Sequence, residues 1–294
     1  MNRVALGLAT LVATAAVAGC GSSSSSGSAP APAGTGSVAA ALIPGCTPDS
    51  MSTLKSGALT IATDQPVYSP WYLHNDPSNG KGFEGALNLA IAKELGYTPA
   101  QIHFVHETFD QAIAPGPKNF DFELDEFSIT PAREKVVDFS APYYTVTQAV
   151  ITTEGSKASG VTTVDGLKPL KLGAQIGSTS YTAITDQIKP SSSPAVYNSN
   201  SDALQALKNH QIDALVVDLP TAFYMTSAQL DNGVIVGQLP DTGAQPEQFG
   251  ALLNKNSPLT SCVSKAVEAL RTDGTLAQIQ DKWLAQAGKA PVLQ

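Results

Sequence analysis

The stretch Phe120–Tyr144 reads FDFELDEFSITPAREKVVDFSAPYY, and it holds the densest chemistry in the chain. It opens with the alternation of apolar and polar residues that is typical of a strand. Two adjacent carboxylates, Asp125 and Glu126, come at the end of that strand. A Thr-Pro pair typical of a helix start follows, and then Arg133. We expect the rest of the chain to hold this stretch opposite a second lobe.

Length and composition exclude several classes of protein. The chain has 294 residues, of which 43% are hydrophobic, so it is long enough for one large or two medium globular domains. Its net charge is −8, and it contains no basic run that would follow a phosphate backbone. The sequence therefore argues against a nucleic-acid-binding protein.

Outward from this stretch, apolar β-rich runs alternate with segments of helical periodicity. The first series has expected strands at 58–63, 102–105 and 120–124 and an expected helix at 84–95. A second series has expected strands at 171–176, 195–197, 213–217 and 234–236, and it is flanked by β-rich runs at 145–153 and 249–253. The last segments of the chain have helical periodicity. This order predicts an α/β protein with mostly parallel sheets. We expect two lobes with crossings near 145 and 242 and a ligand at the carboxyl ends of the strands.

The N-terminus has the pattern of an export signal. Residues 1–19 combine a short positive start with an apolar run too short for a comfortable membrane span. Small residues then precede Cys20, as in a bacterial lipobox, so we expect a lipidated Cys20 and an extracytoplasmic, membrane-anchored protein. The alternative is an ordinary signal peptide with an accidental cysteine. Residues 20–45 are rich in Ser, Gly, Ala and Pro and predict a flexible tether.

Two cysteines remain after Cys20, namely Cys46 and Cys262. A pair of cysteines in an exported protein suggests a disulfide, the alternative being two unpaired thiols. A bridge would join the start of the folded part to a C-terminal helix.

Seven separated segments carry a resemblance that covers roughly residues 56–286. They are GALTIATD, YSPW, GFEGALNLAIAKELG, SITPAREKVVDFSAPYY, IGSTSY, DALQALKNHQIDALVVD and LRTDGTLAQIQDKW. In order and spacing the chain resembles the extracytoplasmic solute-binding proteins, family 3, of polar amino-acid ABC transporters. The resemblance implies a monomeric two-lobed clamshell of the type II periplasmic-binding fold. It implies a free amino acid and a membrane permease as partners, and no cofactor. The expected division is 46–145 for the first lobe, 146–242 for the second and 243–294 for the return to the first.

The resemblance also implies roles in the site. Arg133 matches the arginine that grips the ligand carboxylate, a pairing for which the planar guanidinium is suited; the alternative is a surface ion pair with Glu134 or Asp138. Asp218 matches the acid that holds the ligand ammonium, or else it caps the following helix. The full expected ligand-binding set is Asp64, Tyr68, Trp71, Phe109, Asp125, Glu126, Phe127, Ser128, Arg133, Gly177, Ser178, Thr179 and Asp218.

Asp125 and Glu126 depart from the family pattern, which more often has small or amide residues there. Two carboxylates in a cleft are costly unless cations pair with them. They favour a ligand with a basic side chain, such as arginine, lysine or ornithine, to which the aromatic residues would add cation–π attraction. The alternative is that at least one of them caps backbone or pairs with Arg133 or a lysine.

Signals for an enzyme are weak. The sequence has no Ser/His/Asp motif in a recognisable context and no spacing typical of metal ligands, so we expect a binding protein with no metal. Two rival hypotheses remain. One is a catalytic member of the same fold, similar to a cyclohexadienyl dehydratase, with Asp125 or Glu126 as general acid. The other is a ligand sensor that docks on a signalling receptor.

Overall fold

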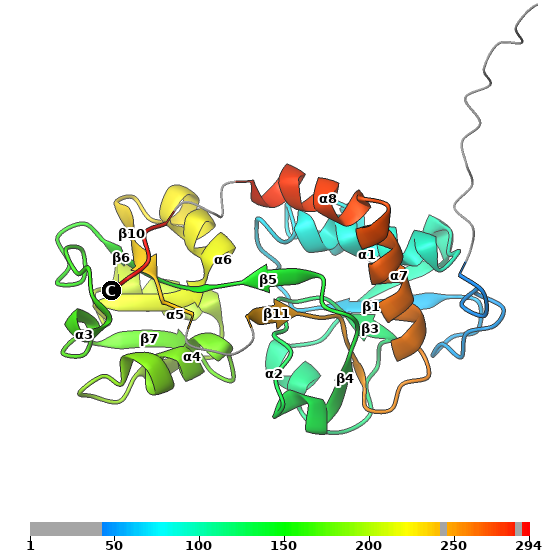
Figure 1. The fold of residues 1–294 in the computed structure, drawn as a ribbon, viewed down its shortest axis with the longest axis horizontal. Coiled ribbons are helices and arrows are strands. Elements are labelled where there is room, and N and C mark those ends of the chain that lie inside the picture. Colours follow the sequence, from blue (N-terminus) through cyan, green and yellow to red (C-terminus); the bar gives the residue numbers. More distant parts are fainter. Residues whose placement is uncertain (1–42, 242–245, 286–289) are drawn as a thin grey trace, which may run out of the picture. The chain divides into compact units, whose positions relative to one another are not determined.

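The structure is a computed structural model that describes residues 43–241, 246–285 and 290–294 (Figure 1). The expected signal peptide, Cys20 and all but the last three residues of the expected tether lie outside this part of the chain. Within the described residues, no helix has both the length and the apolar character needed to cross a membrane.

The first lobe is built on a five-stranded sheet in the order β2-β1-β3-β12-β4. Its strands are β1 (Leu59–Thr63), β2 (Ile102–His106), β3 (Phe122–Glu123), β4 (Val137–Phe139) and β12 (Leu252–Asn254). The pairs β1–β2 and β1–β3 are parallel, whereas β12 runs antiparallel to both of its neighbours. The helices of this lobe are α1 (Phe83–Glu94), α2 (Phe109–Ile113), α7 (Thr260–Thr272) and α8 (Thr275–Leu284), with 3₁₀ turns η1 (Pro77–Asn79), η2 (Pro99–Gln101) and η3 (Arg133–Lys135).

The second lobe has its own five-stranded sheet in the order β10-β6-β9-β7-β8. Its strands are β6 (Gln148–Thr153), β7 (Leu172–Gln175), β8 (Ala195–Tyr197), β9 (Ala214–Asp218) and β10 (Gly233–Gln238). The pairs β7–β8 and β7–β9 are parallel, and β6 is antiparallel to β9 and β10. The helices are α3 (Val164–Leu167), α4 (Thr179–Ala183), α5 (Asn200–Lys208) and α6 (Leu219–Tyr224), with π-turns η4 (Ile184–Ile188) and η5 (Met225–Gln229). Both sheets are thus more mixed than the mostly parallel arrangement we expected.

Two short antiparallel strands join the lobes. They are β5 (Tyr144–Val146) and β11 (Glu247–Phe249), which form a two-stranded sheet with each other (Figure 1). Phe249 of β11 also forms an isolated β-bridge with Ser128 of the first lobe. The expected single runs at 145–153 and 249–253 are each divided into two strands. The reason is that one end of each run pairs in the joining ribbon and the other end pairs in a lobe's sheet. Residues 242–245, where the second crossing was expected, are not described.

The C-terminal helices pack on the first lobe. Residues of α7 and α8 share one apolar core with α1, and Figure 1 shows the three helices together beside the first sheet. Cys46 and Cys262 form a disulfide in this core, which confirms the expected bridge. The bridge attaches the beginning of the folded part to α7.

The last five residues differ from the expected assignment of 243–294 to the first lobe. The N–H of Gln238 donates to Pro291 O at 2.7 Å, and the N–H of Leu293 donates to Gln238 O at 2.9 Å. Leu293 is buried in the core of the second lobe. A free edge of β10 offers backbone groups with no other strand to pair with, and the tail supplies partners for them. The chain therefore ends on the second lobe, as Figure 1 shows.

Candidate functional site

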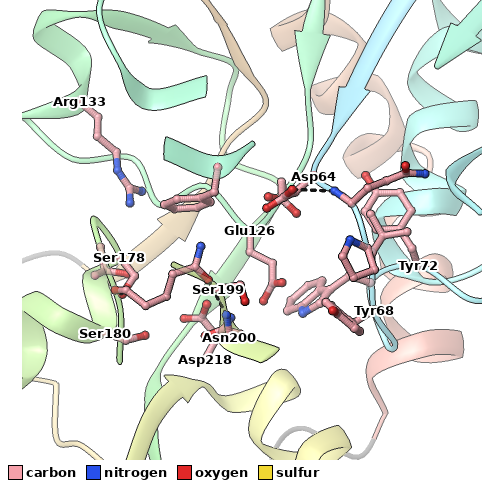
Figure 2. A pocket seen from close by; sticks show the side chains of 18 residues that line it. Asp64, Tyr68, Tyr72, Glu126, Arg133, Ser178, Ser180, Ser199, Asn200 and Asp218 are labelled. Carbon is pink, nitrogen blue, oxygen red and sulfur yellow. Dashed lines mark hydrogen bonds between the residues drawn. The ribbon is translucent and has the colours of Figure 1, made fainter. Parts of the chain in front are cut away.

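A cavity of about 90 Å³ lies between the lobes, where the carboxyl ends of strands from both sheets meet (Figure 2). An enclosed water needs roughly 10–15 Å³ of such space, so the cavity matches a small solute rather than a peptide. Ten of the thirteen residues expected to bind ligand line it: Asp64, Tyr68, Trp71, Phe109, Asp125, Glu126, Arg133, Ser178, Thr179 and Asp218. The structure thus brings together side chains that are more than 150 residues apart in sequence.

Arg133 enters the cavity from η3, and Figure 2 shows its guanidinium directed inward. The N–H of Arg133 donates to Thr130 Oγ1 at 3.2 Å, so Thr130 fixes the start of this turn. Nη1 donates to Ser128 O at 2.7 Å, and Nη2 donates to Gly177 O, from the second lobe, at 3.0 Å. The guanidinium also lies 5.3 Å above the ring of Phe109. A buried, planar cation in this setting suits a carboxylate ligand.

The alternative of a surface ion pair for Arg133 does not hold. Its side chain is buried, and Asp138 pairs instead with Lys255 at 2.9 Å. Burial lowers the pKa of Arg133, while the carboxylates of Glu247 and Asp218 oppose this shift. Since arginine is not deprotonated in proteins, the group remains a cation.

Three expected residues do not line the cavity. Phe127 is fully buried and stacks on Phe109, with ring centroids 4.8 Å apart, so it supports the wall from behind. The hydroxyl of Ser128 donates to Glu247 Oε1 at 2.5 Å, and the carbonyl of Gly177 is taken by Arg133. Each of these residues therefore contacts the lining rather than the space itself.

Asp218 stands at the end of β9, and its carboxylate does not cap the helix that follows. Instead, its Oδ1 accepts a hydrogen bond from Gln148 Nε2 at 2.7 Å. The same Nε2 lies 3.0 Å from Glu247 Oε2. Burial and the nearby Glu247 carboxylate raise the pKa of Asp218 well above its usual range. The lining therefore holds more carboxyl groups than Arg133 alone can pair with.

Asp125 and Glu126 lie on the first-lobe side of the cavity. No described residue donates a hydrogen bond to the Asp125 carboxylate, so it neither caps backbone nor pairs with a described cation. Burial raises the pKa of Asp125 well above its usual range, and Glu84 and Asp64 add to the rise. Burial also raises the pKa of Glu126 well above its usual range, and the nearby Asp218 carboxylate is the next cause. Asp64 lines the cavity too, and it accepts from the N–H of Gln65 at 2.6 Å.

Aromatic side chains close the side of the cavity near the first-lobe core. Trp71 is 2% exposed and packs edge-on against Phe83 and Tyr144. It therefore belongs both to the core and to the wall. Tyr68 is less buried, and its hydroxyl accepts a hydrogen bond from Ser201 of the second lobe. Both residues line the cavity.

Sequence reasoning missed several lining residues. Gln175, at the end of β7, accepts from the N–H of Asn200 at 3.1 Å, and Ser199 caps α5 beside it. The sequence could have predicted these two lining residues, because Gln175 lies near the end of an expected strand and Ser199 shortly precedes an expected helix. Tyr72 and Ser180 also line the cavity, without a comparable signal in the sequence. Within the described residues, no group of three or more His, Cys, Asp or Glu side chains could hold a metal ion.

Glu84 lies in the first lobe next to Asp125 and Glu126, and it is fully buried. Its Oε1 accepts from the N–H of Glu126 at 2.9 Å and from the hydroxyl of Tyr143. Its Oε2 has no hydrogen-bond partner among the described residues. Burial raises the pKa of Glu84 from 4.5 to about 7, against the effect of these two bonds.

We expect Glu84→Gln to flatten the dependence of stability on pH. Between pH 4.5 and 7 the folded protein retains a proton that the unfolded chain has released, so stability falls as pH rises through this window. The loss amounts to about 3 kcal/mol, at 1.36 kcal/mol for each pKa unit. The measurement is urea unfolding at pH 4.5 and pH 8. The exposed Glu268→Gln in α7 is the control, and equal pH slopes for wild type and Glu84→Gln would contradict the expectation.

Comparison of the sequence with known proteins gives one family. The profile of the bacterial extracellular solute-binding proteins, family 3, matches residues 59–286. The ABC transporter arginine-binding protein 1 of Escherichia coli (strain K12) is 31% identical over 214 residues, which are 70% of this chain and 82% of that protein.

Two solved structures are similar over more than three quarters of this chain. An ancestral arginine-binding protein bound to glutamine is 30% identical with a TM-score of 0.66, covering 79% of this chain and 100% of that one. An ancestral amino-acid-binding protein, a precursor of cyclohexadienyl dehydratase, is 29% identical with a TM-score of 0.63, covering 77% and 94%. The fold is therefore that of the type II periplasmic binding proteins.

Proposed function

This chain belongs to the bacterial extracellular solute-binding proteins, family 3, and on that premise we propose that it binds an amino acid with a basic side chain and delivers it to an ABC permease. The ligands we favour are arginine, lysine and ornithine. We further propose that the protein works outside the cytoplasm, anchored through lipid on Cys20, a residue that lies outside the described part of the chain.

The excess of carboxylates in the cavity carries the choice of ligand. An amino-acid head group is a zwitterion, so Arg133 would pair with its carboxylate and Asp218 with its ammonium. Asp64, Asp125 and Glu126 would then face the ligand side chain, and the described lining contains no cation besides Arg133 to balance them. Buried like charges are costly, and a cationic side chain removes that cost. A neutral ligand would leave it in place.

The mechanism follows from the position of the contacts. Arg133 and the aromatic wall belong to the first lobe, so a ligand would bind there first. Closure about β5 and β11 would then bring Thr179 and Asp218 of the second lobe onto the head group. A ligand favours closure only through the contacts that the second lobe adds.

Binding rather than turnover is the activity we propose. The relatives compared above are named as amino-acid-binding proteins, which supports this choice. One of them is also the precursor of a dehydratase, so the two activities are compatible with one fold. Turnover of a cyclic acid without a stable amino-acid complex would favour the catalytic alternative.

We expect the double variant Asp125→Asn/Glu126→Gln to lose arginine affinity by about 100-fold or more. Hydrogen bonds to a charged group contribute about 1.5–3 kcal/mol each, and 1.4 kcal/mol is tenfold in the dissociation constant. Calorimetric titration with arginine and glutamine would measure the change, and the glutamine affinity should not fall in parallel.

The matched control is Glu154→Gln/Asp231→Asn, which removes the same charge from exposed positions of the second lobe. It should leave arginine binding within about twofold, since exposed charges are screened by solvent. A wild-type protein that binds glutamine or glutamate, but neither arginine nor lysine, would refute the proposed ligand class.

A further inference from the structure

Thr221 lies in the first turn of α6 and makes two hydrogen bonds to the opposite lobe. The indole Nε1 of Trp71 is 2.8 Å from its hydroxyl oxygen, and that oxygen is 2.8 Å from Glu126 Oε2. Trp71 and Thr221 are both buried, at 2% and 6% exposure. One hydroxyl of the second lobe thus joins an aromatic residue and an acid of the first lobe, away from solvent.

The chemistry of the three groups fixes the direction of both bonds. An indole nitrogen can only donate, so the oxygen of Thr221 accepts from Trp71. When Glu126 is ionised, its carboxylate can only accept, so the single hydroxyl proton of Thr221 is directed to it. Trp71 therefore orients the proton of Thr221, and Thr221 orients the carboxylate of Glu126.

Glu126 is held at two points by different lobes. Its backbone has a left-handed conformation, with φ of 57°, which is uncommon outside glycine. The first lobe fixes this backbone, because the N–H of Glu126 donates to Glu84 Oε1 at 2.9 Å. The second lobe, through Thr221, holds one oxygen of the side chain. No described residue donates to the other oxygen, Oε1, and Figure 2 shows the side chain reaching into the middle of the pocket.

Since Thr221 and Glu126 belong to different lobes, their bond can form only in the closed protein. An open cleft would leave the Glu126 side chain free to rotate on its fixed backbone. Closure would thus enclose a ligand and would also orient the Glu126 side chain in the cavity lining.

We propose that Thr221 is a positioning residue that completes the cation-binding face of the cavity upon closure, by fixing the Glu126 carboxylate toward the ligand side chain. This inference rests on the proposed function. It adds that discrimination between cationic and neutral side chains is made mainly in the closed form. Thr221 itself touches no ligand in this scheme, and it acts through Glu126.

The test compares arginine with citrulline, its neutral isostere, by calorimetric titration. We expect Thr221→Val to weaken arginine binding by at least about tenfold more than citrulline binding, because only arginine uses the charge of Glu126. Thr221→Ser retains the hydroxyl and should restore the wild-type ratio of the two affinities. Thr221→Ala replaces the Val variant if Val does not fold.

Ser201→Ala is the matched control. Ser201 also bonds across the lobes, to the hydroxyl of Tyr68, but it does not touch an acid of the cavity lining. Its removal should weaken arginine and citrulline equally. In a Glu126→Gln background, Thr221→Val should no longer change the ratio, since the residue acts through that carboxylate.

The outcomes separate this inference from the proposed function. Wild-type titrations that detect no basic amino acid would refute the proposed ligand class before any variant is measured. If the wild type binds arginine, an unchanged ratio in Thr221→Val would overturn the positioning role, as would equal weakening of both ligands. A changed ratio in Thr221→Val that persists in the Glu126→Gln background would overturn it as well.

Discussion

Replacing Arg133 with alanine is expected to abolish detectable amino-acid binding, with a loss of about 1,000-fold in affinity. The guanidinium has five N–H groups, and two of them are used by Ser128 O and Gly177 O. Three remain for a ligand carboxylate. Two charge-assisted bonds at about 1.5–3 kcal/mol each contribute about 3–6 kcal/mol, a range centred near the roughly 4 kcal/mol that corresponds to a factor of 1,000.

The amino-acid affinity of Arg133→Lys should fall between those of the wild type and Arg133→Ala. It retains the charge, but it cannot form the bidentate pair that a planar fork allows. The control is Arg271→Ala on α7, which removes an exposed arginine whose Nη2 donates to Pro142 O. Near-ultraviolet circular dichroism would show whether each variant keeps its fold. A folded Arg133→Ala protein that binds its amino acid within tenfold of wild type would refute the role of this residue.

The roles expected for Arg133 and Asp218 came from the family resemblance, and local order in the sequence agrees with where these residues lie. Arg133 follows Thr130 in a capped turn, and Asp218 ends an apolar strand, so both could be placed at the edge of a sheet. Apolar residues at helical spacing also predicted α1 and α7, and those of α7 lie on one buried face. These features need only neighbours within a few residues.

Residues whose partners come from another lobe were not predictable in this way. Glu247 reads as one polar residue in a linker, yet it accepts from Ser128 Oγ and Gln148 Nε2. Thr221 follows a proline at the start of a helix, where its hydroxyl suggests nothing beyond a local bond. Neither the alternation of apolar and polar residues nor the spacing of motifs in the sequence predicts which side chains of two facing lobes come into contact. The same limit applies to the C-terminal tail, whose place on β10 depends on a free strand edge.

The disulfide is expected to have the largest effect on stability. Cys46 and Cys262 are 216 residues apart, so the bridge closes a loop that contains most of the folded chain. In the chain-entropy description, a loop of this length restricts the unfolded state by about 5 kcal/mol, and removal of native disulfides typically costs 2–5 kcal/mol. Both cysteines are buried in the first-lobe core, and neither lines the cavity.

We therefore expect Cys46→Ala/Cys262→Ala to lower the free energy of unfolding by about 3–5 kcal/mol, with little change in ligand affinity. Alanine is preferred to serine, since a buried hydroxyl would add a cost of its own. Urea unfolding of the double variant and of each single variant measures the effect. Each single variant should lose nearly as much as the double one, because the bridge is lost once in every case. Equal urea midpoints for the double variant and the oxidised wild type would show that the bridge does not stabilise the fold.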